Sequence, residues 1–486
     1  MPANGAPSVL IIGTGFGGIG MAIELRRAGF RDIVLLEKAA DIGGVWRENT
    51  YPGAGCDIPS PYYSYSYEPK PDWPMRFSLR ADIQEYLRRT ADKYGVTGLI
   101  RFNTEVTAAA FDADRGLWRV ETATGATYEA NVLIPAVGQL SRPAWPNLAG
   151  RERFTGPAFH SAEWDHGTDL TGKRVAVIGT GASAIQFVPL IQPKVARLTL
   201  FQRTAPYIVP KTDTVYRPWQ HAMYRRLPRT QLAERAFFWG LCEFATVGLK
   251  GNRAITKAVE WLSAALRARQ IKDRELRAKL TPDHPAGCKR VLFASNYYPA
   301  VAAPNVRLET GRIAEITPGG VRTGDGVEHP ADVIIYATGF RTTEFLGPMK
   351  VLGLAGRDLR EYWSDGARAY LGMSVPGFPN MFLMYGPNTN LGCGSIIYML
   401  ERQARYIRQA VEHIAAGTSY VDVRPEVADH FDAEVQRRLA RSVWSMCRSW
   451  YREDGGRVST NWPGLVSEYD RRTKTLDLAD YQVVVR

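Results

Sequence analysis

Three glycines near the start of the chain have the spacing that lets a backbone turn closely around a pyrophosphate. Gly13, Gly15 and Gly18 follow the apolar run at residues 9–12, which has the character of a buried strand. In this pattern the first glycine permits a tight turn, the second lets the phosphates approach, and the third lets helix and strand pack closely. Glu37 ends the next apolar run, where a carboxylate accepts a hydrogen bond from a ribose hydroxyl. Strand, turn, helix, strand and acid together predict a dinucleotide-binding unit.

The same pattern returns later in the chain with one informative difference. The second copy has Gly179, Gly181 and Ala184, followed by Arg203 and Thr204. Arg203 lies as far after the first glycine of its turn as Glu37 does after its own. An arginine at this place can bind a 2′-phosphate, to which the Thr204 hydroxyl adds a contact. The second unit is therefore predicted to prefer NADP over NAD.

Two unlike dinucleotide sites in one chain imply electron transfer between two cofactors, because a nicotinamide hydride needs an acceptor. FAD is the expected occupant of the first site. Two further apolar runs end in small-residue turns, VLIPAVGQ from residue 132 and DVIIYATGF from residue 332, as expected where a chain crosses between such units. The fold class predicted is α/β, with two interleaved Rossmann-like domains for FAD and NADP.

Length, composition and charge agree with a folded protein of several domains. The chain has 486 residues, 45% of them hydrophobic and 23% charged, with a net charge of +12. Residues 211–283 contain 15 Lys or Arg against 7 Asp or Glu, at helical spacing and without a nucleic-acid-binding motif. We expect a solvated basic face there and no nucleic-acid partner.

The cysteines and the N-terminal residues indicate the cellular compartment in which we expect the protein. Five cysteines are scattered without a CxxC pair or a metal-ligand spacing, so we expect no metal, no disulfide chemistry and a reduced, cytoplasmic setting. The first residues lack the charged start and cleavage site of a signal peptide. The longest apolar stretch of the basic segment, residues 236–249, is too short to span a bilayer, and no stable membrane insertion is expected.

The stretch between the two glycine-rich turns carries a family fingerprint. Its pattern FxGxxxHxxxW followed by Pro or Asp is met by Phe154, Gly156, His160, Trp164 and Asp165. With both turns, QRT at 202–204 and ATGF at 337–340, the chain resembles the class B flavoprotein monooxygenases, and within them the type I Baeyer-Villiger monooxygenases. The resemblance implies a glutathione-reductase-like architecture. It places an FAD domain at 1–141 and 374–486, an NADP domain at 152–210 and 285–373, a helical insertion at 211–284, and a linker at 142–165.

The resemblance also implies residue roles. Gly43, Gly44, Val45 and Trp46 are expected along FAD, with Asp57 and Tyr63 close to its ring system. Arg290 resembles the active-site arginine that pairs with Asp57, and Lys289 beside it is expected near the NADP phosphate. The remaining expected cofactor contacts are Phe16, Val106 and Ser183. A long helix from about Ser395 is expected to point its N-terminus at the flavin.

The implied activity uses FAD, NADPH and O2 to insert an oxygen atom next to a ketone carbonyl, giving an ester or lactone through a flavin C4a-peroxide, with sulfides as further substrates. The alternative is an N- or S-oxygenating flavin monooxygenase, against which the Trp164-Asp165 pair argues. A flavin disulfide reductase is disfavoured because no cysteine pair is evident. The aromatic residues of the insertion, Trp219, Phe237, Phe238, Trp239 and Trp261, are expected in the core or along a substrate tunnel. The sequence leaves the identity of the ketone and the oligomeric state open.

Overall fold

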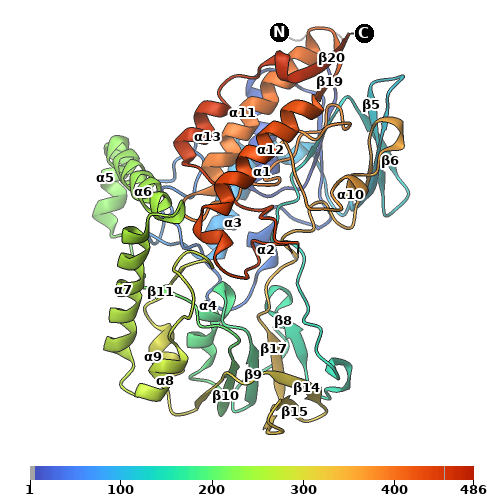
Figure 1. Cartoon of the computed structure of the whole chain (residues 1–486). Helices are drawn as coiled ribbons and strands as arrows, with labels where there is room; N and C mark the ends of the chain where they lie inside the picture. Colours follow the sequence, from blue (N-terminus) through green and yellow to red (C-terminus); the bar gives the residue numbers. More distant parts are fainter. Residues whose placement is uncertain (1–5, 454, 486) are drawn as a thin grey trace.

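The computed structural model describes residues 6–453 and 455–485, which form an α/β structure built on two parallel sheets (Figure 1). The first sheet has the order β3-β2-β1-β7, with β1 (Val9–Ile12), β2 (Ile33–Leu36), β3 (Ile100–Arg101) and β7 (Val132–Pro135). β1 and β7 are buried along their whole length, as the apolar runs predict for strands covered on both faces. The helix α1 (Phe16–Arg27) follows β1 and packs against α11 (Ile396–Ala415).

A second sheet packs against the first. Its strands change the expected boundary between the NADP domain and the FAD domain. Its order is β18-β4-β5-β6, with β4 (Val106–Asp112), β5 (Leu117–Thr122), β6 (Thr127–Ala130) and β18 (Lys350–Leu352). β18 is parallel to β4, and Met349 and Val351 share a core with Leu10. Leu346, Leu359 and Ala369 lie in the same core, so the stretch from residue 346 to 373 packs with the FAD unit, although the sequence placed the whole of 285–373 in the NADP domain.

The other parallel sheet has the order β13-β10-β9-β17-β8, with β8 (Ala158–His160), β9 (Arg174–Ile178), β10 (Arg197–Phe201), β13 (Val306–Glu309) and β17 (Val333–Tyr336). Its core also contains α4 (Ala182–Ile191) and α9 (Tyr297–Val301). β8 lies inside the fingerprint, and His160 pairs with Tyr336. The expectation of a linker at 142–165 was thus wrong for residues 158–160, which add an edge strand to the sheet.

In both units, the first glycine of the turn lies against a carbonyl oxygen at the end of a neighbouring strand. Gly13 has φ +100° and Gly179 has φ +111°. A Cβ at Gly13 would lie 2.8 Å from the carbonyl oxygen of Ala136, and one at Gly179 would lie 2.4 Å from that of Ala337. Each turn therefore needs glycine both for its backbone angle and for its approach to the neighbouring strand end.

Elements from the last part of the chain complete the first unit. The strands β19 (Thr418–Val423) and β20 (Tyr481–Val485) pair antiparallel, and Tyr469 and Tyr481 lie in the same hydrophobic core as Val9. The remaining helices are α2 (Val45–Glu48), α3 (Arg80–Lys93), α10 (Leu359–Tyr362), α12 (Pro425–Ala440) and α13 (Val466–Arg472). The remaining strands are β11 (Ile208–Val209), β12 (Leu292–Phe293), β14 (Ile313–Thr317), β15 (Gly320–Thr323) and β16 (Glu328–Pro330).

Four helices form the segment between β11 and β12, at the left of Figure 1. They are α5 (Pro218–Arg226), α6 (Pro228–Leu249), α7 (Arg253–Gln270) and α8 (Arg274–Lys279). Trp219, Phe237 and Trp261 are 61%, 65% and 72% exposed, so the expectation that they lie in the core or along a tunnel was wrong. Helical spacing revealed an apolar face but not whether another element covers it. Among residues 6–453 and 455–485, no helix has the length and apolar character needed to cross a membrane.

The cysteines pair in space without any spacing signal in the sequence. Cys288 and Cys447 form a disulfide with Cα atoms 6.1 Å apart across a sequence separation of 159 residues. The Cys242 and Cys393 thiols are neighbours, and the Cys393 thiol raises the pKa of Cys242. The expectations of no disulfide and no cysteine pair were therefore wrong, because pairing depends on the fold and not on spacing. The disulfide also removes the cysteine-based reason for a cytoplasmic setting.

Candidate functional site

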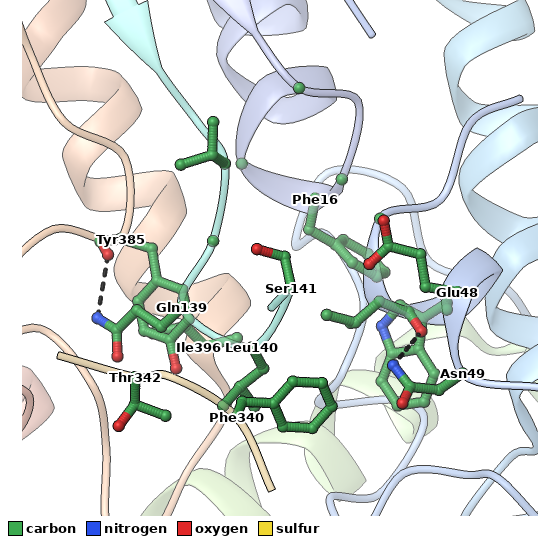
Figure 2. Close-up of a pocket in the computed structure, with 18 of the residues that line it drawn as sticks. Phe16, Glu48, Asn49, Gln139, Leu140, Ser141, Phe340, Thr342, Tyr385 and Ile396 are labelled. Atoms are coloured by element: carbon green, nitrogen blue, oxygen red, sulfur yellow. Dashed lines mark hydrogen bonds between the residues drawn. The ribbon is translucent and has the colours of Figure 1, made fainter. Parts of the chain in front are cut away.

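A cavity of about 600 Å³ lies where the two units meet. Its walls come from the first glycine-rich turn, the stretch around α2, the N-terminus of α4, the chain before β12 and the segments after β7 and β17. Figure 2 shows Phe16, Glu48 and Asn49 on one side, Tyr385, Gln139 and Thr342 on the other, and Phe340 below. The carboxyl ends of β1 and β7 thus open into a single space, which is where open α/β sheets bind ligands.

Most of the expected site residues meet at this cavity. Those that line it are Gly13, Gly15, Phe16, Glu37, Gly43, Gly44, Val45, Trp46, Asp57, Tyr63, Val106, Ser183 and Arg290. Those outside its lining are Gly18, Gly179, Gly181, Ala184, Arg203, Thr204 and Lys289. Gly18 and Ala184 act through packing: a Cβ at Gly18 would lie 1.9 Å from the Gly13 carbonyl oxygen, and Ala184 is fully buried.

Asp57 and Arg290 form an ion pair that faces the cavity. One guanidinium nitrogen of Arg290, Nη2, donates to both carboxylate oxygens of Asp57 at 2.7 Å. The Arg290 side chain is 38% exposed and that of Asp57 is 16% exposed, so the cation is the more accessible partner. The Asp57 carboxylate raises the pKa of Arg290 further above its ordinary value, which keeps the guanidinium charged.

Local structure holds each partner in place. The Cys56 N–H donates to the Ser78 carbonyl oxygen, which fixes the stretch that carries Asp57. Arg290 precedes β12, which pairs with β11 through the Leu292 N–H and the carbonyl oxygen of Tyr207. The guanidinium is thus positioned by a strand of the NADP unit and the carboxylate by a loop of the FAD unit.

The buried thiol and hydroxyl groups around the pair are neutral. Burial raises the pKa of the Cys56 thiol and of the Tyr63 and Tyr385 hydroxyls. Burial also raises the pKa of Tyr451 to about 12, although the Arg290 charge opposes the shift. These groups therefore add no charge of their own beside the Asp57 and Arg290 pair.

Glu37 lines the cavity, but its carboxylate is already engaged. One oxygen accepts from the Thr14 N–H at 3.0 Å and from the Thr14 hydroxyl at 2.7 Å. The other accepts from the Ala39 N–H and from Arg47 Nη1, both at 3.0 Å. A carboxylate has about four acceptor positions. Glu37 therefore fixes the glycine-rich turn, and a ribose hydroxyl would replace one of these bonds.

Several cavity residues were missed by the sequence reasoning. Tyr51 on the FAD side donates from its hydroxyl to Gln186 Oε1 on α4 at 2.9 Å, and Gln186 Nε2 donates to the Gly55 carbonyl oxygen at 3.0 Å. These bonds join the two units beside the ion pair. Trp450 and Tyr451 also line the cavity, and they belong to the SWY stretch near the C-terminus. Nothing in the local pattern of this stretch assigns it to the cavity wall.

Arg203 and Lys289 form a second cationic site, outside the lining of the cavity. Arg203 is exposed, and the neighbouring Gln202 is fixed by a 2.8 Å hydrogen bond from its Nε2 to the Lys279 carbonyl oxygen. Partial burial lowers the pKa of Lys289, and the Arg203 charge lowers it further. Since two like charges converge here, an anion between them would relieve their repulsion.

The fingerprint side chains pack inside the NADP unit. His160 is fully buried and its Nδ1 accepts from the Ala162 N–H at 3.1 Å. Burial lowers the pKa of His160 to about 4, so the ring is neutral at physiological pH. Trp164 packs against Phe159 and Phe187, with ring centroids 5.2 Å apart in each case. Neither side chain lines the cavity, in agreement with a structural part for both.

The two turns leave room for dinucleotides. Apart from the adjoining residues of the turn, no heavy atom of the described residues lies within 4 Å of a Cβ built on Gly181, and only the Gly44 Cα lies within 4 Å of one built on Gly15. Among the described residues, Trp46 Nε1 and Gln139 Oε1 are buried without a hydrogen-bond partner, and both residues line the cavity. Open glycine faces and unpaired polar atoms are what a bound cofactor would cover. The residues present therefore fit FAD at the first turn and NADP at the second.

Comparison with known proteins identifies the family. Residues 10–236 match the family described as pyridine nucleotide-disulphide oxidoreductase. A Baeyer-Villiger monooxygenase of Streptomyces coelicolor is 43% identical over 480 residues, covering 98% of this chain and 92% of the relative. A Baeyer-Villiger monooxygenase of Pseudomonas aeruginosa is 43% identical over 479 residues, covering 98% and 91%.

Solved structures agree over the whole length. A steroid monooxygenase bound to NADP superposes with a TM-score of 0.87 at 28% identity, covering 99% of this chain and 100% of that one. Cyclohexanone monooxygenase from Rhodococcus sp. Phi1 bound to NADP+ has a TM-score of 0.87 at 26% identity, with 99% of each chain covered. These structures confirm the predicted fold class of two Rossmann-like units. By its sequence identity to named relatives over nearly its full length, the chain belongs to the Baeyer-Villiger monooxygenase family.

Proposed function

We propose that the cavity holding Asp57 and Arg290 is where this monooxygenase acts on a ketone. As a member of its family the chain is an FAD- and NADPH-dependent oxidoreductase. The ketone, O2, NADPH and a proton give the ester or lactone, NADP+ and water, so that one oxygen atom enters the product and the other leaves as water. FAD, when bound, supplies the activation of O2, and NADPH supplies the two electrons. The observation that carries the assignment is the charged Arg290 guanidinium facing the cavity with a single carboxylate partner.

Arg290 stabilises negative charge in this site. Its guanidinium is permanently charged and faces the cavity, where a fixed cation stabilises an anion. Only one of its terminal nitrogens is engaged by Asp57, so donors remain for an oxygen atom in the cavity. We assign Arg290 as the group that neutralises charge developing on the substrate carbonyl oxygen.

Asp57 acts through Arg290 as a positioning residue. Its two oxygens hold one end of the guanidinium, which limits the rotation of the long side chain. Without Asp57 the cation would remain in the cavity but lose its fixed direction. We therefore propose that Asp57 determines where the Arg290 charge is placed.

We propose that Arg203 and Lys289 bind the 2′-phosphate of NADPH. Their convergence outside the main cavity supports a separate anion site, and the open face of Gly181 supports a pyrophosphate at the N-terminus of α4. We propose that the FAD domain comprises residues 1–141 and 346–486, and the NADP domain residues 152–210 and 285 to about 345.

We also propose sulfide oxidation and a cytoplasmic location. A sulfur atom is oxidised in the same cavity without rearrangement, so we include sulfides among the substrates.

The need for a supply of NADPH supports a cytoplasmic location, whereas the Cys288 and Cys447 disulfide is unusual there. Whether Cys288 and Cys447 are free thiols or a disulfide in freshly lysed cells decides between a reducing, cytoplasmic location and an oxidising one.

The test is a panel of cyclic, aryl and long-chain ketones with NADPH and O2, scored for ester or lactone by mass. Mass analysis is needed because NADPH loss alone also reports hydrogen peroxide formed without product. An ester that is 18O-labelled when 18O2 is supplied supports the proposal. Oxidation of amines and sulfides with no ester from any ketone would instead favour the N- or S-oxygenating alternative.

A further inference from the structure

The helices α5, α6 and α7 expose an unusual share of apolar surface. In the part of the chain that the structure describes, eighteen large apolar side chains are exposed, and ten of them lie between residues 215 and 262. These ten are Val215, Trp219, Leu227, Leu232, Phe237, Leu241, Phe244, Val247, Trp261 and Leu262. We call the exposed surface of residues 215–262 the insertion face. Large apolar patches on a folded protein usually mark an interaction surface.

The apolar residues of α6 share one side of the helix. Phe237, Leu241 and Phe244 follow at the spacing of one helical face and are 65%, 51% and 62% exposed. α7 packs beside α6 and presents Trp261, the most exposed tryptophan named among the large hydrophobics. None of these side chains lines the cavity. The apolar face is thus separate from the site and is not explained by it.

The exposed charges between residues 217 and 272 all have one sign. They are Arg217, Arg225, Arg226, Arg229, Lys250, Arg253, Lys257, Arg269 and Lys272. The three acids of this stretch are partly buried and engaged inside the protein. Glu234 accepts from Arg76, Tyr216 and Tyr224; Glu243 from Val466 and Ser467; Glu260 from the Ala286 N–H. An incoming partner therefore meets apolar side chains and mainly positive charge, with Asp72 beside Arg225 as an exposed acid from outside this stretch.

We propose that the insertion face docks on an anionic lipid surface. Helices with aromatic and leucine side chains on one side and Lys or Arg beside them lie in the headgroup region of a bilayer, where the rings enter and the cations meet lipid phosphates. Because no helix among the described residues can cross a membrane, the contact is peripheral. A second copy of the chain is a poorer occupant, because two faces of this kind would bring together basic surfaces with no exposed acid between residues 217 and 272 to pair with them.

The test is flotation of the purified holoenzyme with vesicles. One set contains equal parts of phosphatidylcholine and phosphatidylglycerol, and the other contains phosphatidylcholine alone. We expect binding to the anionic set, weak binding to the neutral set, and loss of binding at high salt. The triple variant Arg229→Glu, Arg253→Glu, Lys257→Glu should weaken partition on the order of 100-fold, since each basic residue contributes about fivefold.

Matched variants separate surface docking from net charge. The variant Arg31→Glu, Arg437→Glu, Arg471→Glu changes three exposed arginines elsewhere by the same total charge and should bind as the parent does. A third variant, Phe237→Ser, Phe244→Ser, Trp261→Ser, should lose binding while keeping its bound flavin and its activity on a soluble ketone. The flavin spectrum and circular dichroism report whether each variant is folded.

Three results would overturn the proposal. The first is equal flotation with neutral and anionic vesicles, and the second is equal loss of binding in the two arginine variants. The third is a parent that floats with neither vesicle but is a dimer by light scattering and becomes monomeric in the serine variant. That last result would assign the insertion face to contact between copies of the chain.

Discussion

Arg290 Nη2 lies 2.7 Å from each carboxylate oxygen of Asp57, although 233 residues separate the two along the chain. Each partner is held by a different unit, Asp57 beside the FAD turn and Arg290 at the start of β12. The pair therefore exists only while the two units are closed on one another. A movement between the units would change the direction of the Arg290 charge as well as the shape of the cavity.

Replacing Arg290 should separate reduction from oxygenation. We expect Arg290→Ala to bind FAD and to be reduced by NADPH, but to form ester at a rate lower by about 10²- to 10³-fold, as when a fixed charge-stabilising group is removed from a comparable site. Stopped-flow absorbance measures reduction, and product mass measures oxygenation. Asp57→Asn keeps the cation without fixing it, and should give an intermediate loss. The assignment is falsified if Arg290→Ala forms ester at the parental rate.

Replacing Arg203 should affect NADPH more than NADH. Loss of a charge-assisted contact to phosphate costs about 1.5–3 kcal/mol, so KM for NADPH should rise roughly 10- to 100-fold in Arg203→Ala while KM for NADH changes little. Lys289→Ala should act in the same direction. Arg197→Ala, an exposed arginine on β10, serves as the control. Equal rises for both nucleotides would contradict a phosphate site at Arg203.

His160 should make the protein less stable in acid. Because burial lowers its pKa to about 4 in the folded state, against an ordinary value of about 6.5, the unfolded chain binds more protons between these values. Stability from this group is therefore present above about pH 6.5 and is lost as the pH falls toward 4. Between about pH 7.5 and about pH 5 the loss is about 2 kcal/mol.

In the variant His160→Gln, the loss of unfolding free energy between about pH 7.5 and about pH 5, measured with urea, should be smaller by about 2 kcal/mol. His430→Gln, in which an exposed imidazole is replaced, should leave it unchanged. Identical pH profiles for the parent and His160→Gln would show that His160 titrates normally in the folded protein.

Reduction of the Cys288 and Cys447 disulfide should loosen one wall of the cavity. Cys447 lies three residues before Trp450, and Cys288 lies two residues before Arg290. The disulfide therefore holds the segments that carry Trp450 and Arg290 next to each other. Losing a native disulfide costs about 2–5 kcal/mol, so a dithiol should lower the urea midpoint of the parent. It should also raise the hydrogen peroxide formed per NADPH consumed.

Cys447→Ser should show both changes without added dithiol and no further response to it. Alkylation before and after reduction, followed by mass spectrometry, counts the paired cysteines directly. Five alkylated cysteines in the unreduced, denatured chain would rule out the disulfide.

The sequence predicted what local spacing controls. The two turns, their strands and the helix beginning after Ser395 were placed correctly, because glycine spacing and apolar runs act within a few residues. The Asp57 and Arg290 pair came from family resemblance, since no local pattern joins positions so far apart. Trp261 was expected inside and lies outside, because an apolar side chain at helical spacing does not reveal whether another element covers it.

Contacts that depend on tertiary structure were missed for the same reason. Cys288 and Cys447 meet only after the NADP unit and the C-terminal loop have come together. Tyr51 meets Gln186 only across the boundary between units. The short strand β8 was missed because residues 158–160 become a strand by pairing with β17, without a strong pattern of their own.

The shared core of Val9, Tyr469 and Tyr481 has a consequence for synthesis. β1 emerges first from the ribosome, but part of the core that it joins, including Tyr469 and Tyr481, is translated nearly last. The FAD half can therefore complete its core only after its last segment is made, whereas the segments of the nicotinamide half have already been translated. Production in cells should accordingly depend on chaperones and on the rate at which the last segment is made.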